Sequence, residues 1–274
     1  MVNYKAKKLP IYIVLSIGAL LMIIPFLWMM STSLKTMSET IAMPPKWIPS
    51  VIQFGNYIEA LSMAPFGRYF INSLIVTLLT TIAELLTTIL AAYAFSKLHF
   101  YGKGICFSLL IATMMVPGEM LLIPNFVTIS NLGWMDSYKG LIIPWTANIV
   151  SIFLLRQFFL DIPKELSYAA KIDNCSEFKF IWYIMVPIAK PALITIAILK
   201  MINSWNSFLW PLIVTNSVDL RTLPIGLTSF TTEVGTRYEL LMAATTFVIA
   251  PMIVLFFIMQ KYILAGVGRA GIKG

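Results

Sequence analysis

The polar stretch "ELSYAAKIDNCSEF", Glu165–Phe178, decides how this chain is interpreted, because it lies between two long apolar segments. Ala169 and Ala170 are strong helix formers with almost no side chain. Asn174 tolerates a left-handed backbone conformation and is therefore suited to ending a helix. The stretch predicts a short helix outside the lipid, with an alanine face that suits docking into a groove on another protein. The alternative is an amphipathic helix that rests on lipid headgroups.

The composition of the whole chain is that of an integral membrane protein. Of its 274 residues, 59% are hydrophobic and 12% are charged, and the mean hydropathy is +0.85. A soluble domain carries about 25% charged residues. The basic residues behind the net charge of +8 are scattered beside apolar segments, which indicates membrane topology and no nucleic-acid partner. Cys106 and Cys175 are far apart and fit neither a disulfide framework nor a metal site, so we expect no metal.

Six apolar segments are each long enough to cross a bilayer, which takes about 20 residues. They are Leu9–Leu34, Tyr69–Ser96, Gly104–Ile129, Gly140–Leu160, about Pro187 to Thr215, and Leu240–Ile263. We expect Pro117 and Pro124 to bend the third segment. The first segment lacks a small-residue cleavage site and is interpreted as a retained helix. The sequence therefore predicts an all-α membrane protein with six transmembrane helices and both termini on one side.

The distribution of lysine and arginine sets the expected orientation. With the N-terminus inside, thirteen of these residues flank the inner ends of the segments and six flank the outer ends. The positive-inside rule then places both termini and the Glu165–Phe178 stretch in the cytoplasm of a multi-pass protein of the cytoplasmic membrane. The predicted organisation is a cytoplasmic tail over 1–8, a first span over 9–34, an extracytoplasmic segment over 35–68, a transmembrane domain over 69–263 with a polar loop at about 161–186, and a cytoplasmic tail over 264–274.

The order of residues in the polar loop resembles the EAA motif of ABC importer permeases. The matching positions are Pro163, Glu165, Leu166, Ala169, Ala170, Ile172, Asp173, Ser176, Phe180 or Ile181, and Pro187. Stretches such as "NSLIVT" at Asn72–Thr77, "SWNSFLWPL" at Ser204–Leu212 and "RTLPIGL" at Arg221–Leu227 resemble the carbohydrate-uptake branch of that family. The ending "QKYILAGVGRAGIKG" is similar to that of its second permease subunit, the type found in the maltose importer. The resemblance covers nearly the whole chain.

This resemblance implies a type I importer permease fold with a cytoplasmic coupling helix, a binding-protein-dependent transport function and no enzymatic activity. It implies four kinds of partner: a homologous second permease, a dimer of ATP-binding subunits, an extracytoplasmic solute-binding protein and membrane lipid. The ATPase-coupling residues would be Glu165, Tyr168, Ala169, Ala170, Asp173 and Asn174. Tyr168 replaces the glutamate of the motif and Asn174 replaces its glycine. The chain has no G-x-x-x-x-G-K phosphate loop, so ATP hydrolysis is expected in a partner and no cofactor in this chain.

Ionisable residues inside the apolar segments are costly to bury and therefore indicate function. Glu84, Glu119 and Lys200 are the residues of this kind. Amides and an indole suit sugar recognition, so a candidate substrate path consists of Glu119, Asn203, Trp205 and Asn206. The alternative interpretation is structural, with Lys200 paired to Glu84, to Glu119 or to the partner permease, and Asn203 bridging helices.

Two other functions stay open on the sequence alone. An ion-coupled secondary carrier would often show related halves, and we find no internal repeat. A membrane scaffold without transport activity is the second alternative. Uptake that continues without the ATPase and stops with an uncoupler would favour the carrier.

Overall fold

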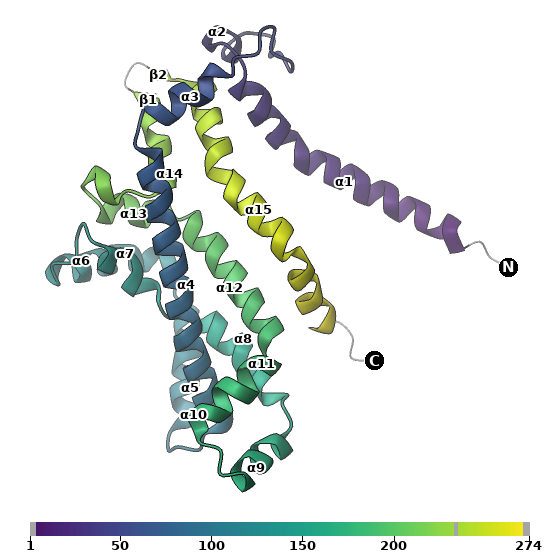
Figure 1. Ribbon diagram of the computed structural model, residues 1–274, viewed down its shortest axis with the longest axis vertical. Coiled ribbons are helices and arrows are strands. Elements are labelled where there is room, and N and C mark those ends of the chain that lie inside the picture. The colour runs from purple at the N-terminus through teal and green to yellow at the C-terminus, as the bar shows by residue number, and fades with distance from the viewer. Residues whose placement is uncertain (1–3, 233–234, 271–274) are drawn as a thin grey trace. The chain divides into compact units, whose positions relative to one another are not determined.

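The computed structural model describes residues 4–232 and 235–270 (Figure 1). It divides into two compact units, the first formed by Met1–Phe66 with Gly226–Pro251 and the second by Gly67–Ile225 with Met252–Gly274. Helix α1 begins at Tyr4 and α15 extends to Ala270. Helix therefore continues into both segments predicted as tails, and the last four residues of the C-terminal tail lie outside the described residues.

The first unit packs the beginning of the chain against a late segment. Its elements are α1 (Tyr4–Ser33), α2 (Met37–Thr40), α3 (Gly55–Ser62), η5 (Leu227–Phe230), the paired two-residue strands β1 (Thr231–Thr232) and β2 (Gly235–Thr236), and α15 (Tyr238–Ala270) as far as Pro251. The ring of Phe66 lies 6.0 Å from that of Phe230 and 6.5 Å from that of Phe247. Arg237 forms ion pairs with Glu59 and Glu239. These contacts tie α3 to the start of α15.

The second unit contains the remaining elements. They are α4 (Phe66–Lys97), α5 (Lys103–Thr113), η1 (Gly118–Leu121), α6 (Leu122–Asn131), α7 (Tyr138–Ile142), η2 (Ile143–Trp145), α8 (Ile149–Leu160), α9 (Lys164–Ile172), α10 (Glu177–Phe180), the π-helical turn η3 (Ile181–Met185), α11 (Val186–Ile188), α12 (Lys190–Trp205), α13 (Leu209–Val214), η4 (Val218–Leu220) and α14 (Leu223–Gly226). Helix α8 packs against both α5 and α12. The small hairpin of the first unit is the only sheet among the described residues, and the other regular elements are helices, as the sequence predicts.

The helices agree with six membrane segments, but only half of these segments are continuous. Three helices are long and apolar enough to span a bilayer, Pro10–Ser33, Phe66–Lys97 and Tyr238–Gln260. Three further segments are pairs of helices bent by 93°, 43° and 81°. Each unbroken segment corresponds to one of the sequence predictions, and each bent pair overlaps one of the other three.

The breaks differ in place from the sequence predictions. In the third segment the chain bends ahead of Gly118, next to Pro117, whereas Pro124 is in the first turn of α6, where a proline is tolerated. The fourth segment restarts at Asn148, whose side chain caps α8 by accepting a hydrogen bond from the Ser151 N–H. The fifth is not continuous to Thr215, because α12 ends at Trp205 and α13 begins only at Leu209.

Helix α4 has its polar side facing the protein and its apolar side facing outward. Thirteen residues of α4 are buried, and seven of them are Asn, Ser, Thr or Glu: Phe66, Tyr69, Asn72, Ser73, Val76, Thr77, Thr80, Thr81, Glu84, Thr88, Ile89, Ala92 and Tyr93. Exposed leucines and isoleucines cover the other side, among them Leu74, Leu78, Ile82 and Leu86. In lipid an outward apolar side chain costs nothing, and small polar residues let helices approach closely. This arrangement is what a membrane environment requires of α4.

One end of α4 is fixed by hydrogen bonds to the loop after α13. The Asn72 side chain donates to the carbonyls of Asp219 and Arg221 and accepts from the Tyr138 hydroxyl. The Ser73 hydroxyl accepts from the Leu223 N–H at 2.8 Å. These bonds hold together chain segments about 150 residues apart and fix one wall of the cavity described below.

The Asp136 carboxylate makes a second link to the same loop. It accepts hydrogen bonds from the N–H groups of Asn216 and Ser217 and from the Ser217 hydroxyl. The Ser217 N–H is the main reason that the pKa of Asp136 lies below its usual value. The loop between α6 and α7 is therefore tied to the end of α13.

Gly140 in α7 lies so close to Trp134 and Val214 that there is no room for a side chain at this position. A Cβ atom there would lie 2.4 Å from the carbonyl oxygen of Trp134 and 3.1 Å from the side chain of Val214. Gly140→Ala is therefore expected to lower the free energy of unfolding by about 1–3 kcal/mol through overpacking. The melting temperature of the purified protein measures this effect. Gly104→Ala, with nothing within 4 Å of the added Cβ, is the matched control, and an equal loss there would contradict the packing explanation.

Candidate functional site

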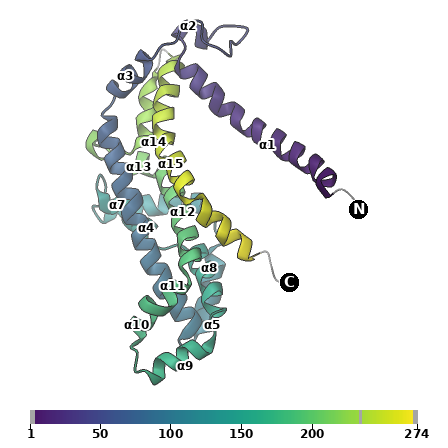
Figure 2. The same cartoon turned by 45° about the vertical axis from the view of Figure 1, so that its right-hand side comes forward.

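Helix α9 has the start and the end that the sequence predicts. It follows Pro163, and Glu165 is in its first turn. Asn174 has a φ of 52°, which confirms the predicted left-handed conformation. The Cys175 N–H then donates to the Ala170 carbonyl at 2.8 Å, which closes the end of the helix. Within the second unit, α9 lies at one end, next to α10 (Figures 1 and 2).

One face of α9 is exposed. Glu165, Tyr168, Ala169 and Ile172 are spaced by three or four residues, so they share this face. All four are exposed; Tyr168 is 61% and Ile172 81% accessible. Asp173 and Asn174, at the end of the helix, are exposed as well. Tyr168 and Ile172 are four residues apart, so their exposed side chains lie next to each other on this face.

Ala170 does not lie on this exposed face, contrary to the alanine face predicted from the sequence. It is only 6% exposed and belongs to a buried cluster that includes Phe159, Phe180 and Met185. Helix α9 therefore presents one of its alanines outward and uses the other to pack against the rest of the second unit. A charge introduced at Ala170 would disturb that packing and would not test the exposed face.

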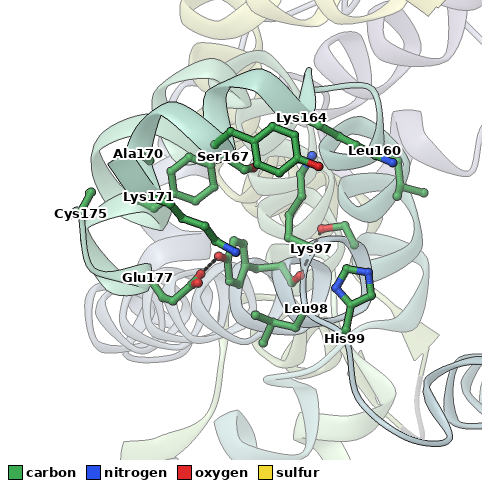
Figure 3. Close-up of a pocket in the computed structure, with 14 residues that line it drawn as sticks. Lys97, Leu98, His99, Leu160, Lys164, Ser167, Ala170, Lys171, Cys175 and Glu177 are labelled. Carbon is green, nitrogen blue, oxygen red and sulfur yellow. Dashed lines mark hydrogen bonds between the residues drawn. The ribbon is translucent and has the colours of Figure 1, made fainter. Parts of the chain in front are cut away.

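A cleft of about 510 Å³ separates α9 from the end of α4 (Figure 3). Tyr168, Lys171, His99 and Glu177 are among its lining residues. On its floor the Tyr93 hydroxyl donates to the Glu177 carboxylate. The Lys97 ammonium donates to the Ile162 carbonyl at 2.9 Å. These two bonds connect the segments before and after α9 to α4, a helix of membrane-spanning length.

A buried ion pair lies in the middle of the second unit. The Lys200 ammonium of α12 is 2.8 Å from the Glu84 carboxylate of α4, and their side chains are 12% and 2% exposed. The other carboxylate oxygen of Glu84 accepts from the Ser151 hydroxyl of α8. Lys200 also donates to the Trp145 carbonyl. Of the three partners that the sequence left open for Lys200, the structure shows Glu84.

Next to this ion pair is a cavity of about 190 Å³. Of the four residues of the candidate substrate path, only Asn203 lines it. Trp205 is buried and packs its ring 5.8 Å from that of Phe70. Asn206 is exposed at the end of α12, and Glu119 is exposed in η1. The structure therefore does not bring the four predicted residues together at this cavity.

Sequence reasoning missed other residues that line the cavity. They include Ser73, Thr80, Trp145, Trp210 and Thr222. The signal for part of this set was present in the sequence: Ser73, Thr77, Thr80 and Glu84 recur at helical spacing in an otherwise apolar segment. The residues from other elements had no such pattern. In the part of the chain that the structure describes, no three potential metal ligands lie together.

Comparison with known proteins identifies the class of protein that carries this fold and loop. Residues 84–269 match the model of the family "binding-protein-dependent transport system inner membrane component", and the chain belongs to this family. It is therefore the membrane-embedded permease component of an importer, and not a catalytic subunit.

The chain is similar to curated permeases over almost its full length. It is 37% identical over 259 residues to the arabinooligosaccharides transport system permease AraQ of Bacillus subtilis, covering 93% of this chain and 92% of that protein. It is 33% identical to the sulfoquinovosyl glycerol transport system permease SmoH of Agrobacterium fabrum, covering 91% and 88%. It is 30% identical to the sn-glycerol-3-phosphate transport system permease UgpE of Yersinia pestis, covering 96% and 97%.

A solved structure shows the same fold. It is the crystal structure of a bacterial ABC transporter involved in the import of the acidic polysaccharide alginate, with a TM-score of 0.83 and 24% sequence identity over 96% of this chain and 98% of that one. The type I importer permease fold predicted from the sequence is confirmed.

Proposed function

We propose that this chain imports a sugar or a sugar-like solute across the cytoplasmic membrane by alternating access, driven by ATPase subunits that contact α9. The observation that carries the proposal is the exposed face of Glu165, Tyr168, Ala169 and Ile172 on a helix packed onto the membrane segments. A soluble ATPase subunit can bind only a surface that lies outside the lipid, and this face is of that kind. The positive-inside count supports a cytoplasmic location for α9 and for both termini.

The proposed cycle needs two states of the bundle that bind the partners differently. ATP binding would close the ATPase dimer, move α9 and the corresponding helix of a homologous second permease, and open the bundle outward to a solute-binding protein. Hydrolysis would restore the inward-facing state. The bonds that Tyr93 and Lys97 of α4 make with the segments on either side of α9 give the movement a path into the membrane.

The relatives suggest the class of solute. AraQ is named for arabinooligosaccharides, SmoH for sulfoquinovosyl glycerol and UgpE for sn-glycerol 3-phosphate. These solutes share a hydroxyl-rich carbon skeleton and differ in charge. We therefore propose a hydroxylated carbohydrate or glycerol derivative as the cargo.

Reconstitution with the second permease, the ATPase and the binding protein tests the function. Uptake of labelled solute into proteoliposomes should require ATP on the ATPase side and should continue in the presence of an uncoupler. Loaded binding protein should stimulate ATP hydrolysis. Uptake that depends on an ion gradient and not on ATP would identify an ion-coupled carrier instead. ATPase activity that loaded binding protein does not stimulate would favour the scaffold.

Tyr168 stands where the family motif has a glutamate, so its contact with the ATPase is expected to be uncharged. Tyr168→Ala removes one ring and one hydroxyl from the edge of the exposed face, and ATP-driven uptake should fall roughly two- to tenfold, the effect of about one lost hydrogen bond. Initial uptake rates at equal membrane levels measure this effect. Tyr168→Phe is the control that separates the ring from the hydroxyl. A rate unchanged in both variants would exclude Tyr168 from the contact.

A further inference from the structure

The cavity beside the ion pair is lined by residues of α4, α7, η2, α12, α13 and the loop at Thr222, and its volume is about 190 Å³. At about 30 Å³ per water molecule, it has room for roughly six waters. This is the scale of a single sugar ring and is below the volume of sites that enclose drug-sized ligands. A longer saccharide could therefore place only one of its rings here.

Its walls present hydrogen-bonding groups that are not fully used. The Thr222 side chain is 4% exposed, and its hydroxyl has no hydrogen-bond partner among the described residues. The Lys200 ammonium has three N–H donors, of which Glu84 and the Trp145 carbonyl take two. The Asn203 amide adds both a donor and an acceptor. A buried polar group without a partner, such as the Thr222 hydroxyl, is costly, and a hydroxyl of a solute would satisfy it. Asn203 is exposed and offers its amide to the same solute.

Two indole rings complete the lining. Trp145 and Trp210 are 5.6 Å apart between ring centroids and stand edge to face at 82°. The Trp210 N–H donates to the Gly140 carbonyl and the Trp145 carbonyl accepts from Lys200, so both residues are held in place. An indole provides a flat apolar surface that covers the C–H face of a sugar ring, next to polar groups for its hydroxyls.

The charge of the cavity is balanced by the protein itself. Lys200 is the charged residue among the described lining residues, and the Glu84 carboxylate neutralises it at 2.8 Å. An anionic solute near Lys200 would also lie close to Glu84, in a site where repulsion is poorly screened. An uncharged solute meets no such penalty.

We propose that this cavity is a solute subsite that holds one uncharged sugar ring, with Lys200, Asn203 and Thr222 binding its hydroxyls and an indole covering its face. This inference rests on the proposed transport function and adds that this chain contacts its cargo directly.

The assembled importer in nanodiscs, without binding protein, is the sample for the test. Saturation-transfer difference NMR is suited to the weak binding of single rings.

The probes are methyl α-L-arabinofuranoside, methyl β-D-glucopyranoside and, as the anionic comparison, methyl β-D-glucuronide. The wild-type complex should transfer saturation to a neutral glycoside and should bind the glucuronide at least tenfold more weakly than the glucoside. Thr222→Val should weaken binding of the neutral probe roughly three- to tenfold, and Asn203→Leu should do the same. The matched control is Thr81→Val, because Thr81 is also buried and unpaired among the described residues but does not line the cavity.

Each result decides a separate question. Absence of transfer to both neutral probes, or equal binding in wild type, Thr222→Val and Asn203→Leu, would overturn the subsite. Equal affinity for glucoside and glucuronide would overturn the preference for an uncharged ring. A loss of the same size in Thr81→Val would show a general effect of removing buried hydroxyls and would also overturn the subsite. ATP-driven uptake by the same wild-type complex reports on the proposed function separately, so uptake with no binding at the cavity removes only this inference.

Discussion

Glu84→Gln is expected to lower the free energy of unfolding by about 3–5 kcal/mol, because it leaves the Lys200 ammonium buried without its counter-ion. Glu84 is 2% exposed and also accepts a hydrogen bond from Ser151, so three membrane segments meet at its carboxylate. At about 2–4 °C per kcal/mol for a domain of this size, the melting temperature should fall by roughly 10 °C. A thermal-unfolding assay on the purified protein measures the change.

The double variant Glu84→Gln/Lys200→Met supplies the decisive comparison. Removing both charges leaves no uncompensated ion, and replacement of a buried pair by apolar groups is often neutral, so the double variant should regain most of the stability that Glu84→Gln loses. Glu119→Gln is the matched control, since Glu119 is exposed, and should change stability by less than about 0.5 kcal/mol. A double variant as unstable as the single one would show that charge pairing is not the source of the effect.

Ala169→Glu is expected to reduce ATP-driven uptake at least tenfold while the protein stays folded. Ala169 lies between Tyr168 and Ile172 on the exposed face of α9, so the added carboxylate would meet the ATPase without disturbing the permease. A charge buried at a protein contact without a partner costs several kcal/mol. Since about 1.4 kcal/mol corresponds to a factor of ten, this cost is large enough for the expected loss of uptake. The measurements are uptake and ATPase rates in proteoliposomes, with the melting temperature as a check on folding.

Two substitutions control for this result. Ala169→Ser keeps a small uncharged side chain and should retain uptake. Ala170→Glu introduces the same carboxylate one residue further along, into the buried cluster, and should lower the melting temperature. Normal uptake in Ala169→Glu would remove α9 from the ATPase contact, whereas a loss of stability equal to that of Ala170→Glu would show that the exposed face is misassigned.

The parts of the structure that follow local rules could be predicted from the sequence. Apolar length located the membrane segments, except that the fifth begins and ends earlier than predicted. Pro163 and Asn174 located the two ends of α9. The face of α9 that packs inward could not be predicted, because Ala169 and Ala170 are chemically identical and only the tertiary structure buries one of them. The break between α12 and α13 was missed for a related reason, since "WNSFLWP" is apolar enough to read as continuous helix.

The candidate site could be predicted only in part. The cost of burying an isolated charge indicated that Lys200 has a partner but left Glu84, Glu119 and the second permease open, and the structure pairs Lys200 with Glu84. The cavity itself is assembled from α4, η2, α12, α13 and a loop at Thr222. Which residues line it depends on how segments far apart in the sequence pack together, and a local sequence pattern does not predict that packing. Trp205 shows the difficulty: it stands two residues from Asn203 but points into the packing around Phe70.

The hydroxyl groups on the inward side of α4 also bear on how that helix moves. Thr77, Thr81 and Thr88 are buried, and none of their hydroxyls has a hydrogen-bond partner in the described part of the chain. The hydroxyl of a threonine in a membrane helix can donate a hydrogen bond to a carbonyl of the preceding turn, as Thr80 does to Val76. Displacing α4 past its neighbours would therefore break no hydrogen bond at Thr77, Thr81 or Thr88, so the resistance to such a displacement comes from the bonds at Asn72, Glu84, Tyr93 and Lys97.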